Sequence, residues 1–72
     1  MTQTDPAVVS ELVRSVIVTF GLPFDVLAVN ESQAGWKIHV RAGTGGLVHI
    51  TIPDGRPFAM RLAIRELLEA EL

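Results

Sequence analysis

Two alternating runs on either side of a glycine-rich break constrain this chain more than any other feature. Gly35 to Ala42 (GWKIHVRA) carries an apolar residue at every second position, and Leu47 to Ile52 (LVHITI) repeats the alternation. Successive side chains of a strand point to opposite faces of a sheet, so each run predicts a strand with one apolar and one polar face. The break between them, Gly43 to Gly46 (GTGG), predicts the turn of an antiparallel hairpin.

The numbering of the apolar positions predicts the length of this turn. Directly opposed residues of an antiparallel pair share a face, and the inward residues of both runs are even-numbered, so the loop must contain an odd number of residues. A three-residue loop places Val40 opposite Val48 and His39 opposite His49. A five-residue loop would instead place Arg41 opposite His49.

A third strand is expected over 24–30, between Pro23 and a polar connection. Apolar residues occur at both its even and its odd positions, so its inward face is not obvious from alternation alone. Burying the carboxylate of Asp25 without a partner would cost several kcal/mol. We therefore expect the even set to point inward, namely Phe24, Val26 and Ala28. Leu27 and Val29 then point outward.

The first helix is predicted over 5–20. Thr4 or Asp5 can cap its free N–H groups, and Pro6 suits the first helical position because it has no N–H to satisfy. Gly21 predicts a left-handed residue at the end of the helix. The apolar residues recur every three or four positions on one face: Val8, Val9, Leu12, Val13, Val16, Ile17 and Phe20.

The last helix is predicted over 57–71, with Asp54 as a candidate cap. Arg65 and Glu69 are spaced for an i,i+4 ion pair on its solvated side. Its apolar stripe comprises Ala59, Met60, Ala63, Ile64, Leu67 and Leu68, flanked by Phe58, Leu62 and Leu72.

These elements predict an α+β fold: one domain over 1–72 in the order α-β-β-β-α. The strands form a three-stranded antiparallel meander, and both helices pack on one face of it. The even-numbered face of the sheet is then covered and the odd-numbered face is open.

Composition narrows the function. The chain has 72 residues and no cysteine, which excludes disulfides and thiolate metal sites. With 49% hydrophobic residues on so small a body, some apolar surface stays exposed, and a homodimer is one natural outlet. No apolar run reaches the 18 or so residues of a membrane span, and the N-terminus lacks the pattern of a signal peptide, so we expect a cytoplasmic protein.

The open face is the main candidate site. Apolar and basic residues mix there as they do in protein interfaces, so we expect a small interaction module, binding itself or another protein, rather than an enzyme. No arrangement of nucleophile and base has a sequence signature, and no cofactor is expected. The expected interaction face comprises Leu27, Val29, Lys37, His39, Arg41, Leu47, His49 and Thr51.

Two histidines on this face raise the possibility of a metal site. If Val26 opposes Ile38, then Asp25 lies opposite His39, which lies opposite His49. An Asp–His–His row has the ligand types of an open Zn²⁺ site, and it could equally respond to pH. The alternative is that two solvated histidines are simply neighbours.

Nucleic-acid binding is the alternative function. Its candidate residues are Lys37, Arg41, Arg56, Arg61 and Arg65, although the net charge of −2 disfavours phosphate binding. The order α-β-β-β-α resembles the double-stranded-RNA-binding domain over the whole chain. That resemblance implies phosphate contacts at the start of the last helix, where this chain has two arginines and no lysine.

The segment Gly46 to Pro53 (GLVHITIP) is similar to the HicA ribonuclease toxins. That resemblance implies a related fold. The catalytic Gly-Ser-His of those toxins is replaced by Gly43-Thr44-Gly45, so their activity is not expected here.

Overall fold

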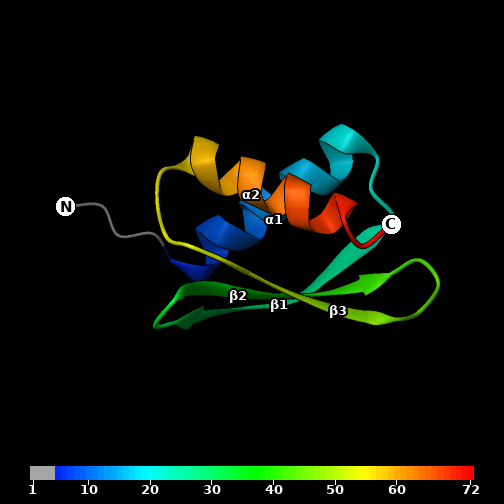
Figure 1. Cartoon of the computed structure of the whole chain (residues 1–72), viewed down its shortest axis with the longest axis horizontal. Helices are drawn as coiled ribbons and strands as arrows, with labels where there is room; N and C mark the ends of the chain where they lie inside the picture. The colour runs from blue at the N-terminus through cyan, green and yellow to red at the C-terminus, as the bar shows by residue number, and fades with distance from the viewer. Residues whose placement is uncertain (1–4) are drawn as a thin grey trace.

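The computed structural model describes residues 5–72 and has the expected order of one helix, three strands and one helix (Figure 1). The strands form a single antiparallel sheet in the order β1-β2-β3, and both helices lie over the same face of it. The predicted α+β architecture is therefore confirmed. The elements are α1 (Pro6–Phe20), β1 (Phe24–Ser32), β2 (Gly35–Ala42), β3 (Leu47–Ile52) and α2 (Pro57–Glu69).

Helix α1 begins and ends as its sequence predicts. The Asp5 side chain accepts a hydrogen bond from the Val8 N–H at 3.0 Å, and Pro6 occupies the first helical turn. Gly21 closes the helix in the left-handed conformation. Thr4, the other candidate cap, lies outside the described residues.

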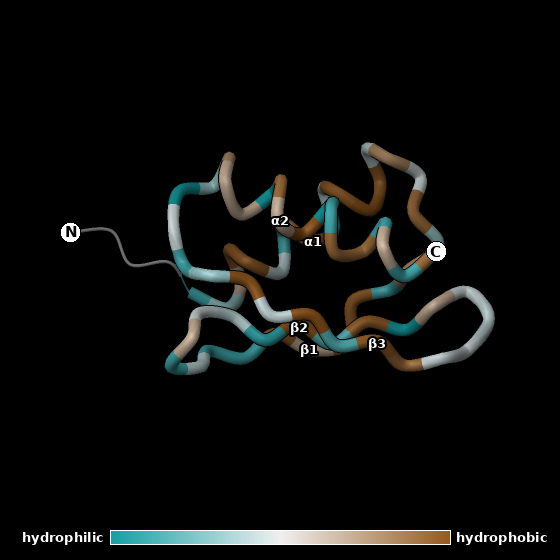
Figure 2. Tube along the Cα trace, viewed as in Figure 1, coloured by the Kyte–Doolittle hydropathy of each residue, from teal (hydrophilic) through white to brown (hydrophobic). Residues whose placement is uncertain are grey.

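The core lies between the helices and the even-numbered face of β2 and β3. Figure 2 shows that hydrophobic positions recur in both layers. Trp36 is only 2% exposed, as expected for a core residue. The buried side chains are Val9, Val13, Val16, Leu22, Phe24, Trp36, Ile38, Val40, Ile50, Ile52, Met60, Ile64 and Leu68.

The β2–β3 hairpin has the predicted three-residue loop. Val40 pairs with Val48 and His39 pairs with His49. The Gly45 N–H donates to the Ala42 carbonyl at 2.8 Å, and Gly45 has a φ of 96°, which a glycine adopts without the steric cost of a Cβ.

Strand β1 contains a bulge, and this corrects its predicted register. Val26 pairs with Val40, but the register then shifts, so that Ala28 pairs with His39 and Val29 with Ile38. One extra residue in a strand moves every following side chain to the other face. Val29 consequently packs against the core and Ala28 is exposed, the reverse of the prediction. Burying valine in place of alanine gains about 1–2 kcal/mol, since each buried methylene contributes about 0.8 kcal/mol.

Helix α2 lacks the predicted cap. Its N-cap residue is Arg56, with no side-chain hydrogen bond to the helix. Asp54 instead accepts a hydrogen bond from Trp36 Nε1 at 3.1 Å, which satisfies the indole of a buried side chain. The helix ends at Glu69, two residues before the predicted end, and the Arg65–Glu69 pair is confirmed at 3.5 Å.

The first residue of β2, directly after the turn from β1, must be glycine. Gly35 is buried with a φ of 130°, a conformation that other residues rarely adopt. A Cβ at this position would overlap the carbonyl oxygen of Ile52 and the backbone of Pro53. The close approach joins the start of β2 to the end of β3.

Candidate interaction surfaces

The open face is the side of the sheet away from both helices (Figure 1). The observed register arranges its residues in three rows that cross the strands from β1 through β2 to β3. The first row is Asp25, Arg41 and Leu47; the second is Ala28, His39 and His49, with the bulge residue Leu27 beside Ala28; the third is Asn30, Lys37 and Thr51.

Most residues predicted for this face are found on it. Leu27 is 46% exposed and Leu47 is 68% exposed. Lys37, Arg41 and Thr51 are exposed as well. Val29 is the exception, because the bulge turns it toward the core.

Ala28 and Asn30 take their places on the open face, and neither was predicted there. The signal was present in the strand sequence: only a bulge allows both Val26 and Val29 to face the core.

His39 and His49 form the centre of the open face. Their ring centroids are 4.7 Å apart and the rings are inclined at 64°, an edge-to-face arrangement. His39 is half-buried and His49 is exposed. The predicted pairing of the two histidines is thus confirmed in the register and in the side chains.

The predicted Asp–His–His row does not form. Asp25 pairs with Arg41, and Ala28 takes the position opposite His39, because Val26 opposes Val40 and not Ile38. Within residues 5–72, no group of three or more His, Cys, Asp or Glu side chains is placed to hold a metal ion.

The five basic residues of the nucleic-acid hypothesis lie in different parts of the fold. Lys37 and Arg41 are on the open face, whereas Arg61 and Arg65 line a hollow in the helix layer. Arg56 precedes α2. The structure therefore does not gather them into one basic surface.

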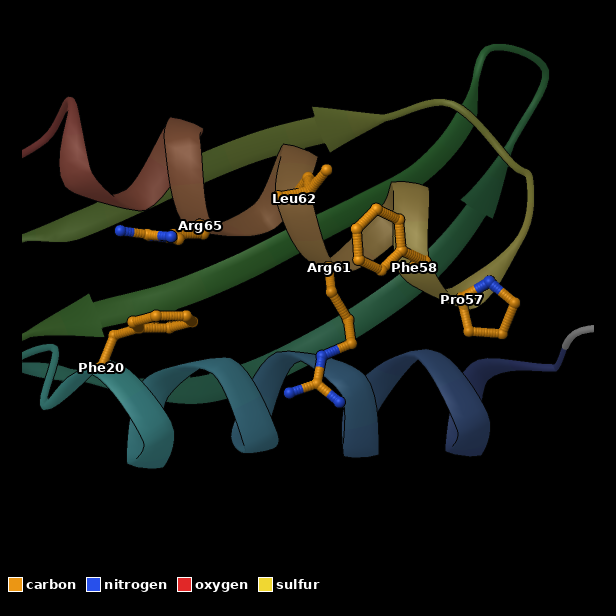
Figure 3. A pocket seen from close by; sticks show the side chains of 6 residues that line it. All are labelled: Phe20, Pro57, Phe58, Arg61, Leu62 and Arg65. Atoms are coloured by element: carbon orange, nitrogen blue, oxygen red, sulfur yellow. The ribbon is translucent and has the colours of Figure 1, made fainter.

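A second apolar surface lies between the two helices and was not anticipated from the sequence (Figure 3). A hollow of about 480 Å³ is lined by Phe20 of α1 and by residues of α2 between Pro57 and Arg65. Phe58 is 74% exposed, and the Arg65 guanidinium carbon lies 4.2 Å from the centre of the Phe20 ring. Periodicity showed which helix faces are apolar but not how far the neighbouring helix covers them. We call this surface the helix groove: Phe20, Pro57, Phe58, Arg61, Leu62 and Arg65.

No protein-family model matches this chain, and neither does any curated protein or solved structure. None of the helices in the described part of the chain is long and apolar enough to cross a membrane.

Proposed function

We propose that this protein is a small non-catalytic interaction module that binds a protein partner on the open face of its sheet. The observation that carries the proposal is the exposure of Leu27 and Leu47 beside Arg41, on a face that no other segment of residues 5–72 covers. Self-association belongs to the same proposal, since a chain with this much apolar surface gains by covering it.

The composition of the open face supports a protein interface. An antiparallel sheet can leave one face in water, and polar residues then suffice on that face. Leu27 and Leu47 lie on this face near Arg41 and His39. Polar side chains at the two leucine positions would serve the fold equally well. An arginine next to exposed apolar side chains is typical of protein interfaces.

The charges of the open face indicate the chemistry of the partner. Among the described residues, Lys37 and Arg41 are its cations, and Asp25, directly opposite Arg41, is its one carboxylate. Elsewhere the chain is acidic, as its net charge of −2 requires. A partner with an acidic surface around an apolar contact would therefore match the open face and be repelled by the rest of the molecule.

Nucleic-acid binding is the less favoured function. Phosphate contacts supply most of the affinity of nucleic-acid binders, and they need several cations within reach of one backbone. Lys37 and Arg41 lie on the other side of the sheet from Arg61 and Arg65.

A pull-down with matched variants tests the proposal. The full chain serves as bait in three forms: wild type, Leu27→Asp/Lys37→Glu on the open face, and Phe58→Asp in the helix groove. We expect a partner that wild type and Phe58→Asp retain and that the open-face variant loses. Circular dichroism checks that all three baits are folded.

Two results would contradict the proposal. One is a partner lost with Phe58→Asp and kept by the open-face variant, which would place binding in the helix groove. The other is loss of all binding after nuclease treatment, which would favour the nucleic-acid alternative.

A further inference from the structure

The two edges of the sheet differ in how they are protected. Unpaired strand edges invite pairing with another chain, and proteins block them with charges, prolines and bulges. The β1 edge carries a bulge at Leu27 and the charged residues Asp25 and Glu31. Strand β3 (LVHITI) has no charged residue, no proline and a continuous register with β2. The β3 edge is therefore the unprotected one.

The hydrogen bonds of the hairpin show which backbone groups of β3 point outward. The Ala42 N–H donates to the Gly46 carbonyl at 2.7 Å, so these two residues form a hydrogen-bonded pair. Such pairs alternate along an antiparallel ladder, so the even residues of β3 bond to β2 and the odd residues turn their N–H and C=O groups to the free edge. The outward set is Leu47, His49 and Thr51. The close approach of the His39 and His49 rings, 4.7 Å, fits a non-hydrogen-bonded pair.

No other segment of the described chain satisfies these outward groups. Among residues 5–72, no hydrogen bond outside the strand ladders involves Leu47, His49 or Thr51. Three N–H and three C=O groups thus line an uncharged edge rich in β-branched residues, a combination that favours strand addition.

We infer that the β3 edge pairs antiparallel with the β3 edge of a second copy of this chain. When a strand pairs with its own copy about a two-fold axis, the two residues of each pair are both odd-numbered or both even-numbered. The apolar face of one sheet therefore continues into the apolar face of the other. An axis at His49 pairs Leu47 with Thr51 of the second copy and uses every outward group. An axis at Ile50 would set Leu47 against Pro53, which has no N–H to donate.

Helix α2 can pack against the α2 helix of the second copy in this dimer. Figure 3 shows β3 crossing behind α2, with the end of β3 on the side of α2 away from α1, whereas Arg61 and Arg65 line the groove toward α1. At 100° per residue, the opposite side of α2 carries Ala59, Ala63 and Leu67. Small side chains let two helices pack closely, so the α2 helices of the two copies can meet above the joined strands.

The dimer would form a six-stranded sheet with all four helices on one face. The two open faces would become one surface, and the His39–His49 pairs of both copies would meet at the axis. The β3 edge would be the site of the self-association that the proposed function includes. This pairing depends on the backbone of β3 and not on Leu27 or Lys37.

Sedimentation equilibrium of the full chain from micromolar to millimolar concentration tests the inference. We expect a reversible dimer that weakens about tenfold or more in Thr51→Lys, because lysine on an edge strand opposes pairing. Ala59→Arg, at an exposed position on the same side of α2, should weaken it similarly. Asn30→Lys, which places the same charge at an exposed position of β1, should leave it unchanged, as should Leu27→Asp/Lys37→Glu. A wild type that stays monomeric throughout, or a dimer that Thr51→Lys and Ala59→Arg leave intact, would overturn the inference.

Amide hydrogen exchange locates the interface independently of any variant. The N–H groups of Leu47, His49 and Thr51 should exchange more slowly as the protein concentration rises. Those of Val48 and Ile50, already bonded to β2 in the monomer, serve as controls and should slow only as far as dimerisation stabilises the whole fold. A dimer in which the three outward amides exchange at the monomer's rate would contradict pairing through β3. Loss of the dimer in Leu27→Asp/Lys37→Glu alone would instead place self-association on the open face.

Discussion

The two faces of the sheet are built from the same alternating strands but meet different demands. On the covered face, Trp36, Ile38 and Val40 are almost completely buried, and no buried side-chain nitrogen or oxygen among residues 5–72 lacks a hydrogen-bond partner. On the open face, Leu47 is 68% exposed and the polar groups face water. The covered face is constrained by packing, whereas the open face can vary without loss of the fold. The exposed leucines of the open face therefore contribute little to stability, and binding a partner gives them a role.

The largest effect should come from Gly35 on the covered side. Gly35→Ala adds a Cβ that overlaps the Ile52 carbonyl at a positive φ, so the free energy of unfolding should fall by about 3 kcal/mol or more. Urea unfolding measures this. Gly46→Ala is the matched control, because a Cβ at Gly46 meets nothing within 4 Å and its φ is not positive. Equal stabilities of the two variants would refute the close approach of Gly35 to β3.

A smaller loss is expected at Asp54. Asp54→Ala leaves the indole N–H of buried Trp36 without an acceptor, which should cost about 1–3 kcal/mol. Asp54→Asn keeps a side-chain oxygen in the same place and should retain most of the stability. If the asparagine variant is as unstable as the alanine variant, the loss does not arise from this hydrogen bond.

The smallest effects compare two neighbours on opposite faces. Val29→Ala should destabilise the protein by about 1 kcal/mol, because Val29 packs against the core. Leu27→Ala removes more carbon atoms but should change stability by less than about 0.5 kcal/mol, since Leu27 is 46% exposed. The reverse order in thermal unfolding would show that β1 has no bulge and that Val29 faces outward.

The hairpin could be predicted in detail because its alternatives differ in the face they bury. Only a loop with an odd number of residues keeps Val40 and Val48 on the same face of the sheet. Gly45 supplies the left-handed residue that the three-residue loop needs. Periodicity likewise predicted both helices and the residues that they bury, but Val8, Phe20 and Leu67, which were placed in the same apolar stripes, are exposed. These features depend on local pattern, which the sequence displays directly.

The register of β1 could not be predicted by the same means. Both sets of its side chains contain apolar residues, so excluding Asp25 from the core left the bulge undetected. The partner of Asp54 was also hidden, because Trp36 lies 18 residues away and only the folded chain brings them together. The predicted Asp25–His39–His49 row was wrong because the bulge in β1 was not detected.

Protection of the open face in its native surroundings tests the central claim most directly. The chain has no cysteine, so Leu27→Cys reports on the open face alone, and Val18→Cys, at a position 79% exposed on α1, is the control. We predict that a thiol reagent labels both variants readily when they are purified. In an extract of the source cells, Cys at position 27 should be protected while Cys at position 18 stays reactive. Equal reactivity of the two thiols in the extract would contradict the account.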